Sequence, residues 1–138
     1  MISVRKQEVV KLENVLHLYQ AVGWTNYTHQ PQMLEKSLSH SLAIYLAHDG
    51  DSVVGLVRLV GDGFSSIFVQ DLLVLPSYQR QGIGSNLMKE ALGDFKDAYQ
   101  VQLVTEQTEK TLGFYRSLGF ETLSTYDCTG MIWVDRKR

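Results

Sequence analysis

The stretch that decides the fold reads Asp71-Leu72-Leu73-Val74-Leu75-Pro76-Ser77-Tyr78-Gln79-Arg80-Gln81-Gly82-Ile83-Gly84-Ser85, and residues 86–92 follow it directly. An apolar run that begins near Ile67 stops at Pro76, which cannot donate a hydrogen bond to a sheet ladder. After the loop, apolar residues recur at helical spacing, namely Ile83, Leu87, Met88, Ala91, Leu92 and Phe95. The stretch therefore predicts a buried strand, a tight loop and a helix, with the glycines at the helix N-terminus.

At the N-terminus of a helix, the two glycines can help to bind an anion. The first turn of a helix has backbone N–H groups without an intrahelical partner. Gly82 and Gly84 carry no Cβ, so a ligand can approach these N–H groups closely, and helix N-termini favour anions. Arg80 adds a positive charge beside them. The loop is therefore a candidate anion site.

The spacing of the glycines separates this loop from two other phosphate-binding loops. A dinucleotide fingerprint requires a third glycine where Leu87 stands, and a P-loop requires Lys and Ser/Thr after its last glycine. Both patterns fail, which argues against a nucleotide-binding α/β domain. With Gln79, Gly82 and Gly84 in the motif positions, the loop resembles the Gln/Arg-x-x-Gly-x-Gly/Ala pyrophosphate loop of the GCN5-related N-acetyltransferases (GNAT).

A second motif supports this resemblance about thirty residues downstream. Residues 114–120 read Phe-Tyr-Arg-Ser-Leu-Gly-Phe, which is similar to the Phe-Tyr-x-x-Leu-Gly-Phe signature of the same superfamily. Residues 57–63 and 70–76, with Gly130-Met131, also look like a group of small bacterial-type members whose acceptors are mostly undefined. Two motifs in the expected order carry more weight than either one alone.

The composition limits the remaining choices. A chain of 138 residues with 44% hydrophobic residues is expected to form a single domain, 1–138, around one core. The formal net charge of −2 gives no basic field for nucleic acid or a membrane. With a single cysteine, no signal-like segment and no apolar run of about 20 residues, we expect a soluble, cytoplasmic protein.

Periodicity and turn residues predict an α/β (α+β) chain, and Gly55 inside a strand indicates a bulge or a close approach of neighbouring backbone. This order matches the GNAT fold, for which we expect a mixed, mostly antiparallel sheet of about seven strands with about four helices on both faces. The expected strands are 2–5, 42–47, 53–60, 65–75, 101–104, 120–124 and 131–134. The expected helices are 12–22, a short one from Pro31 to Leu38, 83–95 and 109–118.

The resemblance implies an acetyl-CoA-dependent N-acetyltransferase, an acyltransferase that moves the acetyl group directly to a primary amine in a ternary complex. In this superfamily the backbone of the strand before the loop pairs with the pantetheine arm and polarises the acetyl carbonyl. The implied coenzyme A contacts are Leu72, Leu73 and Val74 on that strand, Gln79, Arg80, Gln81, Gly82, Ile83, Gly84 and Ser85 in the loop, and Thr108.

The second motif implies a catalytic residue. Tyr115 aligns with the tyrosine that often acts as general acid toward the coenzyme A thiolate, and it also counts among the coenzyme contacts. A core tyrosine beside Phe114 and Leu118 is the plain structural alternative. Thr108 and Thr111 depart from the Asn and Ala that the family often has there.

The general base is less well defined by the sequence. Asp71 lies on the strand that leads to the loop, where a carboxylate could take a proton from the amine or bind the amine as a cation. Equally, Asp71 could be structural and pair with Arg58 on the neighbouring strand. Asp62 and Glu106 are reserve candidates.

The acceptor side is expected in the polar and aromatic segment 24–30. Trp24, Tyr27 and His29, together with Asp71, are the candidate substrate residues for a small amphipathic cation, although the segment could simply close a core edge. The four histidines have no metal-like spacing, so we expect no metal. Protein lysines, N-termini or aminoglycosides remain open as acceptors, as do a coenzyme-binding sensor without turnover and a homodimer.

Overall fold

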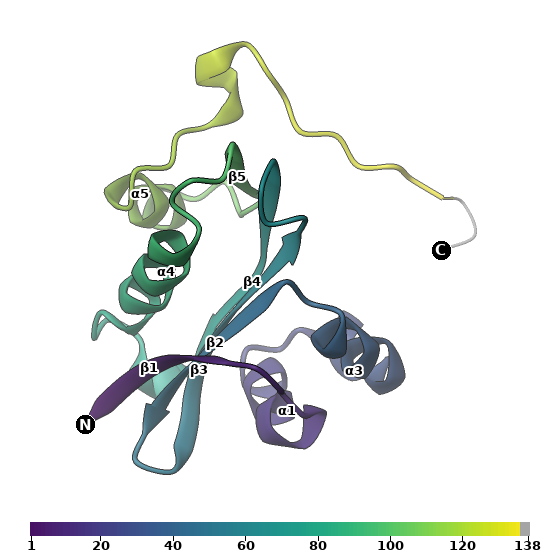
Figure 1. The fold of residues 1–138 in the computed structure, drawn as a ribbon, viewed down its shortest axis with the longest axis vertical. Helices are drawn as coiled ribbons and strands as arrows, with labels where there is room; N and C mark the ends of the chain where they lie inside the picture. The colour runs from purple at the N-terminus through teal and green to yellow at the C-terminus, as the bar shows by residue number, and fades with distance from the viewer. Residues whose placement is uncertain (136–138) are drawn as a thin grey trace. The chain divides into compact units, whose positions relative to one another are not determined.

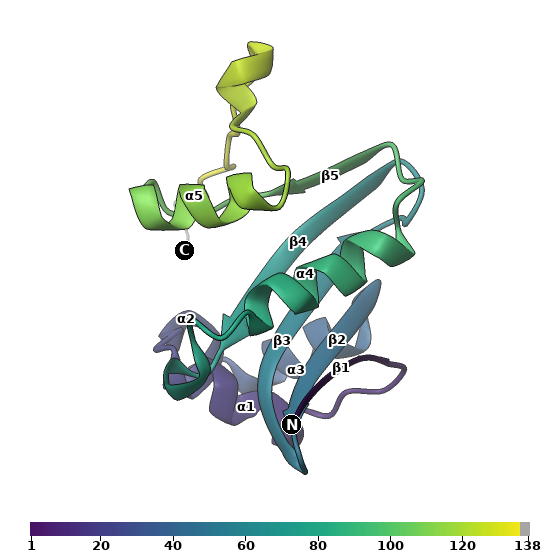
Figure 2. The same cartoon turned by 90° about the vertical axis from the view of Figure 1, so that its left-hand side faces the viewer.

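The computed structural model describes residues 1–135. It divides into two units, Met1–Leu103 and the part that begins at Val104, and each is described by itself. The first unit contains the sheet and the loop that the sequence singles out, and Figures 1 and 2 show it from two directions.

The first unit is built on a five-stranded sheet whose spatial order follows the chain, β1-β2-β3-β4-β5. Neighbouring strands are antiparallel except for β4 and β5, which are parallel. The strands are β1 (Ile2–Gln7), β2 (Ala43–Asp49), β3 (Ser52–Gly61), β4 (Ser66–Val74) and β5 (Gln100–Leu103).

Helices cover both faces of this sheet, as Figures 1 and 2 show. Helices α1 (Leu12–Ala21), α2 (Thr25–Thr28) and α3 (Pro31–Ser39) lie on one face, and α4 (Ile83–Asp94) lies on the other. The core on the first face joins apolar residues of α1 and α3 to those of three strands: Val15, Leu18, Tyr19, Leu34, Leu38, Ile44, Leu46, Leu56 and Leu73. Burial of this continuous apolar surface holds the helices on the sheet.

Gly55 lets α4 pack closely against the sheet. A Cβ added at Gly55 would lie 3.1 Å from Leu87 Cδ1, 3.2 Å from the Leu73 carbonyl oxygen and 3.3 Å from Ile83 Cγ2. The predicted close approach is confirmed. It brings Ile83, in the first turn of α4, close to β3.

The second unit contains α5 (Glu109–Ser117) and a 3₁₀ turn over Leu123–Tyr126. The mixed α/β fold is confirmed, but residues 1–135 form five strands instead of about seven and five α-helices instead of about four. The added helix is α2, which is too short for its periodicity to be recognised in the sequence.

The two expected strands that are wrong are 120–124 and 131–134. Near the first, Thr122 accepts a backbone hydrogen bond from Thr125 N at 3.1 Å, and its hydroxyl lies 3.1 Å from that of Ser124. Such local bonds compete with a sheet ladder. Residues 131–134 are neither helix nor strand in the structure. A short run of apolar residues does not make a strand without a partner.

No helix among residues 1–135 has both the length and the apolar character that crossing a membrane requires.

Candidate functional site

β4 has a free edge where β5 ends. β5 pairs with β4 only from Ser66 to Val69, whereas β4 continues to Val74. At the same point, Arg58 pairs with Asp71 and Leu59 with Val69, which leaves Gln70 as an extra residue in β4. This is a β-bulge, which bends the strand and interrupts its ladder. Within residues 1–135, no strand pairs with β4 beyond the bulge on the β5 side.

Specific peptide groups point out from this free edge. The N–H of Leu75 donates to the Val54 carbonyl on β3 at 2.9 Å. Because peptide direction alternates along a strand, the peptide groups of Val74 and Leu72 point away from β3. The Gln79 side-chain amide donates to the Val74 carbonyl oxygen at 3.1 Å, which agrees with this direction. A ligand with amide groups can therefore pair with Leu72 and Val74.

The glycine loop adjoins this edge and ends at the N-terminus of α4. Two of its residues have left-handed backbone, Arg80 with φ 66° and Gly82 with φ 81°. Gly82 is the N-cap of α4, and no side chain caps the helix there. The first bond to it comes from Asn86 N, at 3.0 Å.

The N–H groups of this loop remain available. In the part of the chain that the structure describes, no backbone carbonyl accepts from the N–H groups of residues 80–85. Successive N–H groups in turns with left-handed residues form a concave nest that binds anions, and the helix dipole adds to the effect. The geometry is that of an anion cradle, as the sequence predicts.

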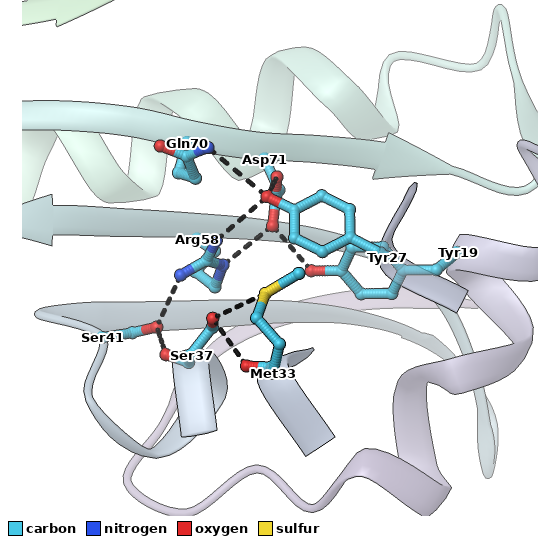
Figure 3. Close-up of polar contacts among 8 residues, drawn as sticks. All are labelled: Tyr19, Tyr27, Met33, Ser37, Ser41, Arg58, Gln70 and Asp71. Atoms are coloured by element: carbon cyan, nitrogen blue, oxygen red, sulfur yellow. Dashed lines mark hydrogen bonds and ion pairs between the residues drawn. The ribbon is translucent and has the colours of Figure 1, made fainter. Parts of the chain in front are cut away.

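A buried ion pair lies on the face of the sheet that α1–α3 cover. Asp71 is 2% exposed and Arg58 is 4% exposed. Arg58 Nε donates to Asp71 Oδ2 at 2.8 Å, which confirms the predicted pairing with Arg58. Tyr19 OH also donates to Oδ2, at 2.8 Å, and Tyr27 OH donates to Oδ1 at 2.9 Å. Figure 3 shows the four side chains converging from α1, α2, β3 and β4.

The Tyr27 hydroxyl is held from three sides. Besides donating to Asp71, it accepts from Arg58 Nη2 and from Gln70 Nε2, both at 3.3 Å. Arg58 also reaches Ser41 Oγ, at 3.2 Å. Burial and the nearby Asp71 carboxylate raise the pKa of Tyr27 above its usual value, and they raise the pKa of Tyr19 in the same way. Both phenols are therefore neutral donors at physiological pH.

An aromatic cluster covers this network. The Trp24 ring stacks on Tyr27 with centroids 6.1 Å apart, and Tyr19 meets Tyr27 edge-on at 5.1 Å. The structure thus brings together three of the predicted substrate residues, Trp24, Tyr27 and Asp71. Trp24 and Tyr27 are only half-buried, so they form the accessible side of the cluster.

His29 is placed differently. It is exposed at the C-terminal end of α2. It lines a groove of about 970 Å³ along α3, whose other lining residues include Met33, Lys36 and Ser37 but neither Tyr27 nor Asp71. Its predicted role in substrate binding stays a prediction.

Two predicted site residues belong to the second unit. Thr108 is the N-cap of α5, where its hydroxyl accepts from Thr111 N–H at 3.2 Å. Tyr115 meets Phe114 and Phe120 edge-on, with centroids 5.0 and 5.9 Å away, and burial raises the pKa of Tyr115. Coenzyme contact by both residues, and acid catalysis by Tyr115, stay predictions.

The reserve candidates for the base have other surroundings. The Asp62 carboxylate accepts from the backbone N–H groups of Phe64, Ser65 and Ser66 and so holds the turn between β3 and β4. Glu106 is exposed in the second unit.

Sequence reasoning missed Tyr19 and Gln70. Tyr19 fits the apolar stripe of α1, and only its polar tip within a buried stripe could have indicated a hydrogen-bonded role. A bulge such as the one at Gln70 leaves no signature in a single sequence.

Comparisons with known proteins agree with this geometry. Residues 40–122 match the family model described as "Acetyltransferase (GNAT) domain". A GNAT-family acetyltransferase from Streptococcus pneumoniae TIGR4 is 78% identical, with a TM-score of 0.92 over 99% of both chains. A probable acetyltransferase from Staphylococcus aureus, 24% identical over 98% of this chain and 100% of that one, shares the fold with a TM-score of 0.79.

Curated relatives from plants are more distant and longer. The chloroplastic serotonin N-acetyltransferase 2 of rice is 30% identical over 66% of this chain, which spans 48% of that protein. The chloroplastic GCN5-related N-acetyltransferase 1 of Arabidopsis thaliana is 27% identical over 97% of this chain and 68% of that protein. With a family match over residues 40–122, an anion cradle at α4 and a free edge on β4, the chain belongs to the GNAT acetyltransferase family.

Proposed function

We propose that this chain transfers an acetyl group from acetyl-CoA to a small primary amine, by direct transfer in a ternary complex. One observation carries the proposal: the cradle of unpaired N–H groups at the N-terminus of α4 adjoins the free edge of β4. An anion cradle beside an unpaired strand edge suits a ligand that joins a pyrophosphate to a chain of amides.

The residues present fit coenzyme A. The N–H groups of residues 82–85 would hold its pyrophosphate, and Arg80 would add a charge-assisted contact. The outward-pointing peptide groups of Leu72 and Val74 would pair with its pantetheine amides, in the manner of an added strand. When bound, acetyl-CoA supplies the acetyl group as a thioester.

For the acceptor, we propose the half-buried pair Trp24 and Tyr27 as the binding surface. An aromatic face attracts an amphipathic amine through both apolar contact and the cation–π interaction. The rice relative's name identifies an arylalkylamine acceptor, serotonin, which is compatible with an aromatic acceptor surface.

The geometry favours a positioning role for Asp71. Its charge is balanced by Arg58 at 2.8 Å, and both carboxylate oxygens already accept hydrogen bonds. A general base must also reach the proton that it takes from the substrate, and only 2% of Asp71 is exposed. We therefore propose that Asp71 fixes the hydroxyl of Tyr27, which in turn orients the acceptor. In the mechanism that the resemblance implies, Tyr115 would then protonate the leaving thiolate.

Calorimetric titration of acetyl-CoA tests the coenzyme half of the proposal. The wild type is compared with Gly84→Trp, which fills the first turn of α4. The matched control is Gly93→Trp in the same helix, where an added Cβ meets nothing within 4 Å. We expect saturable binding in the wild type and the control, and at least tenfold weaker binding in Gly84→Trp. Circular dichroism checks that all three are folded.

Thiol release with a panel of amines tests the acceptor half. Turnover with arylalkylamines or other small amines supports the proposal. Acetyl-CoA binding without turnover would overturn the enzymatic assignment for small amines and favour a sensor or a protein acceptor. Absence of binding in the wild type would overturn the coenzyme assignment itself.

A further inference from the structure

The hydroxyl of Tyr27 has no free position for a substrate. It donates its proton to Asp71 Oδ1 at 2.9 Å, and its oxygen accepts from Arg58 Nη2 and Gln70 Nε2, both at 3.3 Å. A phenol group has one proton and two lone pairs to offer, so these three bonds use all of them. The Tyr27 hydroxyl can therefore act on an acceptor amine only through one of its partners.

Gln70 is the partner that is not buried. Asp71 and Arg58 are 2% and 4% exposed, whereas Gln70 lies at the surface of the first unit. It is also the extra residue of the bulge in β4, and bulges next to active sites redirect a side chain. At about 3.3 Å per strand residue, Gln70 precedes Leu72 and its outward-pointing peptide group by about 7 Å. The Gln70 side chain is thus close to the edge proposed for the pantetheine arm.

The hydrogen bonds of the network fix the direction of the Gln70 amide. A carboxylate has no proton to donate, so Tyr27 donates to Asp71 and can only accept from Gln70. The amide therefore turns its NH₂ group toward Tyr27. Its carbonyl oxygen, Oε1, lies on the far side of the amide from Tyr27, as Figure 3 shows. Within Met1–Leu103, no side chain or backbone N–H donates to this oxygen.

We propose that Gln70 Oε1 accepts a hydrogen bond from the amino group of an aromatic primary amine whose ring packs on Trp24. Trp24 offers a half-buried ring, which stacks on the ring of Tyr27 with centroids 6.1 Å apart. Tyr27 connects the two contacts, because its ring packs on Trp24 and its hydroxyl holds the amide of Gln70. The inference rests on the proposed acetyl transfer, and it identifies Gln70 as the residue that orients the acceptor.

An uncharged hydrogen-bond acceptor suits a nucleophilic amine. Arg58 balances the charge of Asp71 at 2.8 Å, so the network adds no net negative charge beside Gln70. A free carboxylate would favour the ammonium form and raise the pKa of the amine. An ammonium ion has no lone pair with which to attack a thioester. The amide oxygen of Gln70 holds the amine through one N–H without the strong preference for the ammonium that a carboxylate has.

Calorimetric titration of two ligands separates this hydrogen bond from a structural role of Gln70. Phenethylamine can donate an N–H, whereas its N,N,N-trimethyl derivative has the same ring and charge but no N–H. Both are titrated into the wild type and Gln70→Met with excess coenzyme A, which has no acetyl group to transfer. We expect Gln70→Met to weaken phenethylamine binding about tenfold and to leave binding of the trimethyl derivative unchanged. The control Gln100→Met, at an exposed glutamine where β5 begins, should leave both unchanged.

The outcomes distinguish this inference from the proposed function. Equal weakening of both ligands in Gln70→Met would show that Gln70 only supports the aromatic surface, and it would overturn the inference. A wild type that does not bind phenethylamine would also overturn it. A loss of acetyl-CoA affinity in Gln70→Met, with phenethylamine binding unchanged, would assign Oε1 to the coenzyme instead. Phenethylamine that binds through Gln70 but releases no thiol from acetyl-CoA would overturn the transfer to such amines and leave the contact standing.

A double-mutant cycle tests the path from Tyr27 through Gln70. Tyr27→Phe removes the hydroxyl that holds the Gln70 amide and keeps the ring that stacks with Trp24. We expect it to weaken phenethylamine binding severalfold. The double variant Tyr27→Phe/Gln70→Met should bind no more weakly than Gln70→Met alone, because both changes remove the same contact. Losses that add up would show that the hydroxyl acts independently of Gln70 and would overturn this path; circular dichroism checks that every variant is folded.

Discussion

The substitution Asp71→Asn offers the sharpest test of the buried network. It keeps the size of the side chain but removes the charge that faces Arg58. The Asn oxygen can replace Oδ2 and still accept from Tyr19 and Arg58, whose donor atoms lie 2.8 Å away. The amide nitrogen then faces Tyr27, whose oxygen already accepts two hydrogen bonds.

The size of the expected loss of stability in Asp71→Asn follows from the burial of Arg58. Arg58 is 4% exposed, so its charge cannot reach water once the carboxylate is gone. Breaking a buried pair in this way costs about 3–5 kcal/mol, out of a total stability of about 5–15 kcal/mol. The retained hydrogen bonds place our expectation at the lower end, about 3 kcal/mol, which is a fall in Tm of roughly 10 °C for a chain of this size.

Urea unfolding followed by tryptophan fluorescence measures this cost. In a Trp133→Phe background the signal comes from Trp24, which stacks on Tyr27 within the network. Asp51→Asn, at an exposed carboxylate in the turn between β2 and β3, is the control and should change stability by less than about 0.5 kcal/mol. The double variant Arg58→Met/Asp71→Leu should recover only part of the loss, because it removes both charges but also takes away the acceptor of the buried Tyr19 hydroxyl. A loss below about 1 kcal/mol in Asp71→Asn would refute the reasoning about the uncompensated guanidinium.

Three further outcomes follow from the site. Tyr27→Phe should raise the KM for the acceptor severalfold and leave acetyl-CoA affinity unchanged by calorimetry; an equal loss of both would contradict an acceptor role. Arg80→Gly should stabilise the fold by about 1 kcal/mol in urea unfolding, because glycine tolerates a φ of 66°, yet weaken acetyl-CoA binding severalfold; unchanged binding would remove Arg80 from the cradle. Hydrogen bonds from Ser65, Phe64 and Ser66 lower the pKa of Asp62, so its contribution, complete above the unfolded pKa of about 3.9, is lost as the pH falls below that value. Asp62→Asn should therefore show a smaller loss of stability between pH 5 and 2 than the wild type, and parallel curves would contradict this.

The parts of the site that the sequence predicts are those fixed by local chemistry. The cradle at Gly82 depends on a glycine with left-handed backbone directly before a helix, and neighbouring residues in the sequence determine both features. The pairing of Arg58 with Asp71 was foreseeable because adjacent antiparallel strands place the two residues opposite each other. Such short-range features need no knowledge of the rest of the fold.

The features that the sequence does not predict depend on distant partners. Tyr19 reaches Asp71 across 52 residues, so no local pattern distinguishes it from the other members of the α1 stripe. The expected strand at 131–134 has the right residues but no neighbour to pair with in the structure. Tyr115 is a similar case. Its motif predicts a catalytic role, but its ring contacts in the second unit, with Phe114 and Phe120, do not test that role.

The bulge at Gln70 has a consequence for changes in chain length. Because Leu59 pairs with Val69 and Arg58 with Asp71, removing Gln70 would preserve both cross-strand pairs and the face on which each side chain lies. β4 would become one regular strand without the bend that the bulge imposes after Val69. We expect a chain lacking Gln70 to fold around the same core, but with the peptide groups of Leu72 and Val74 displaced from their present direction. The bulge therefore decides how the pantetheine-binding edge is presented, although Gln70 adds nothing to the core.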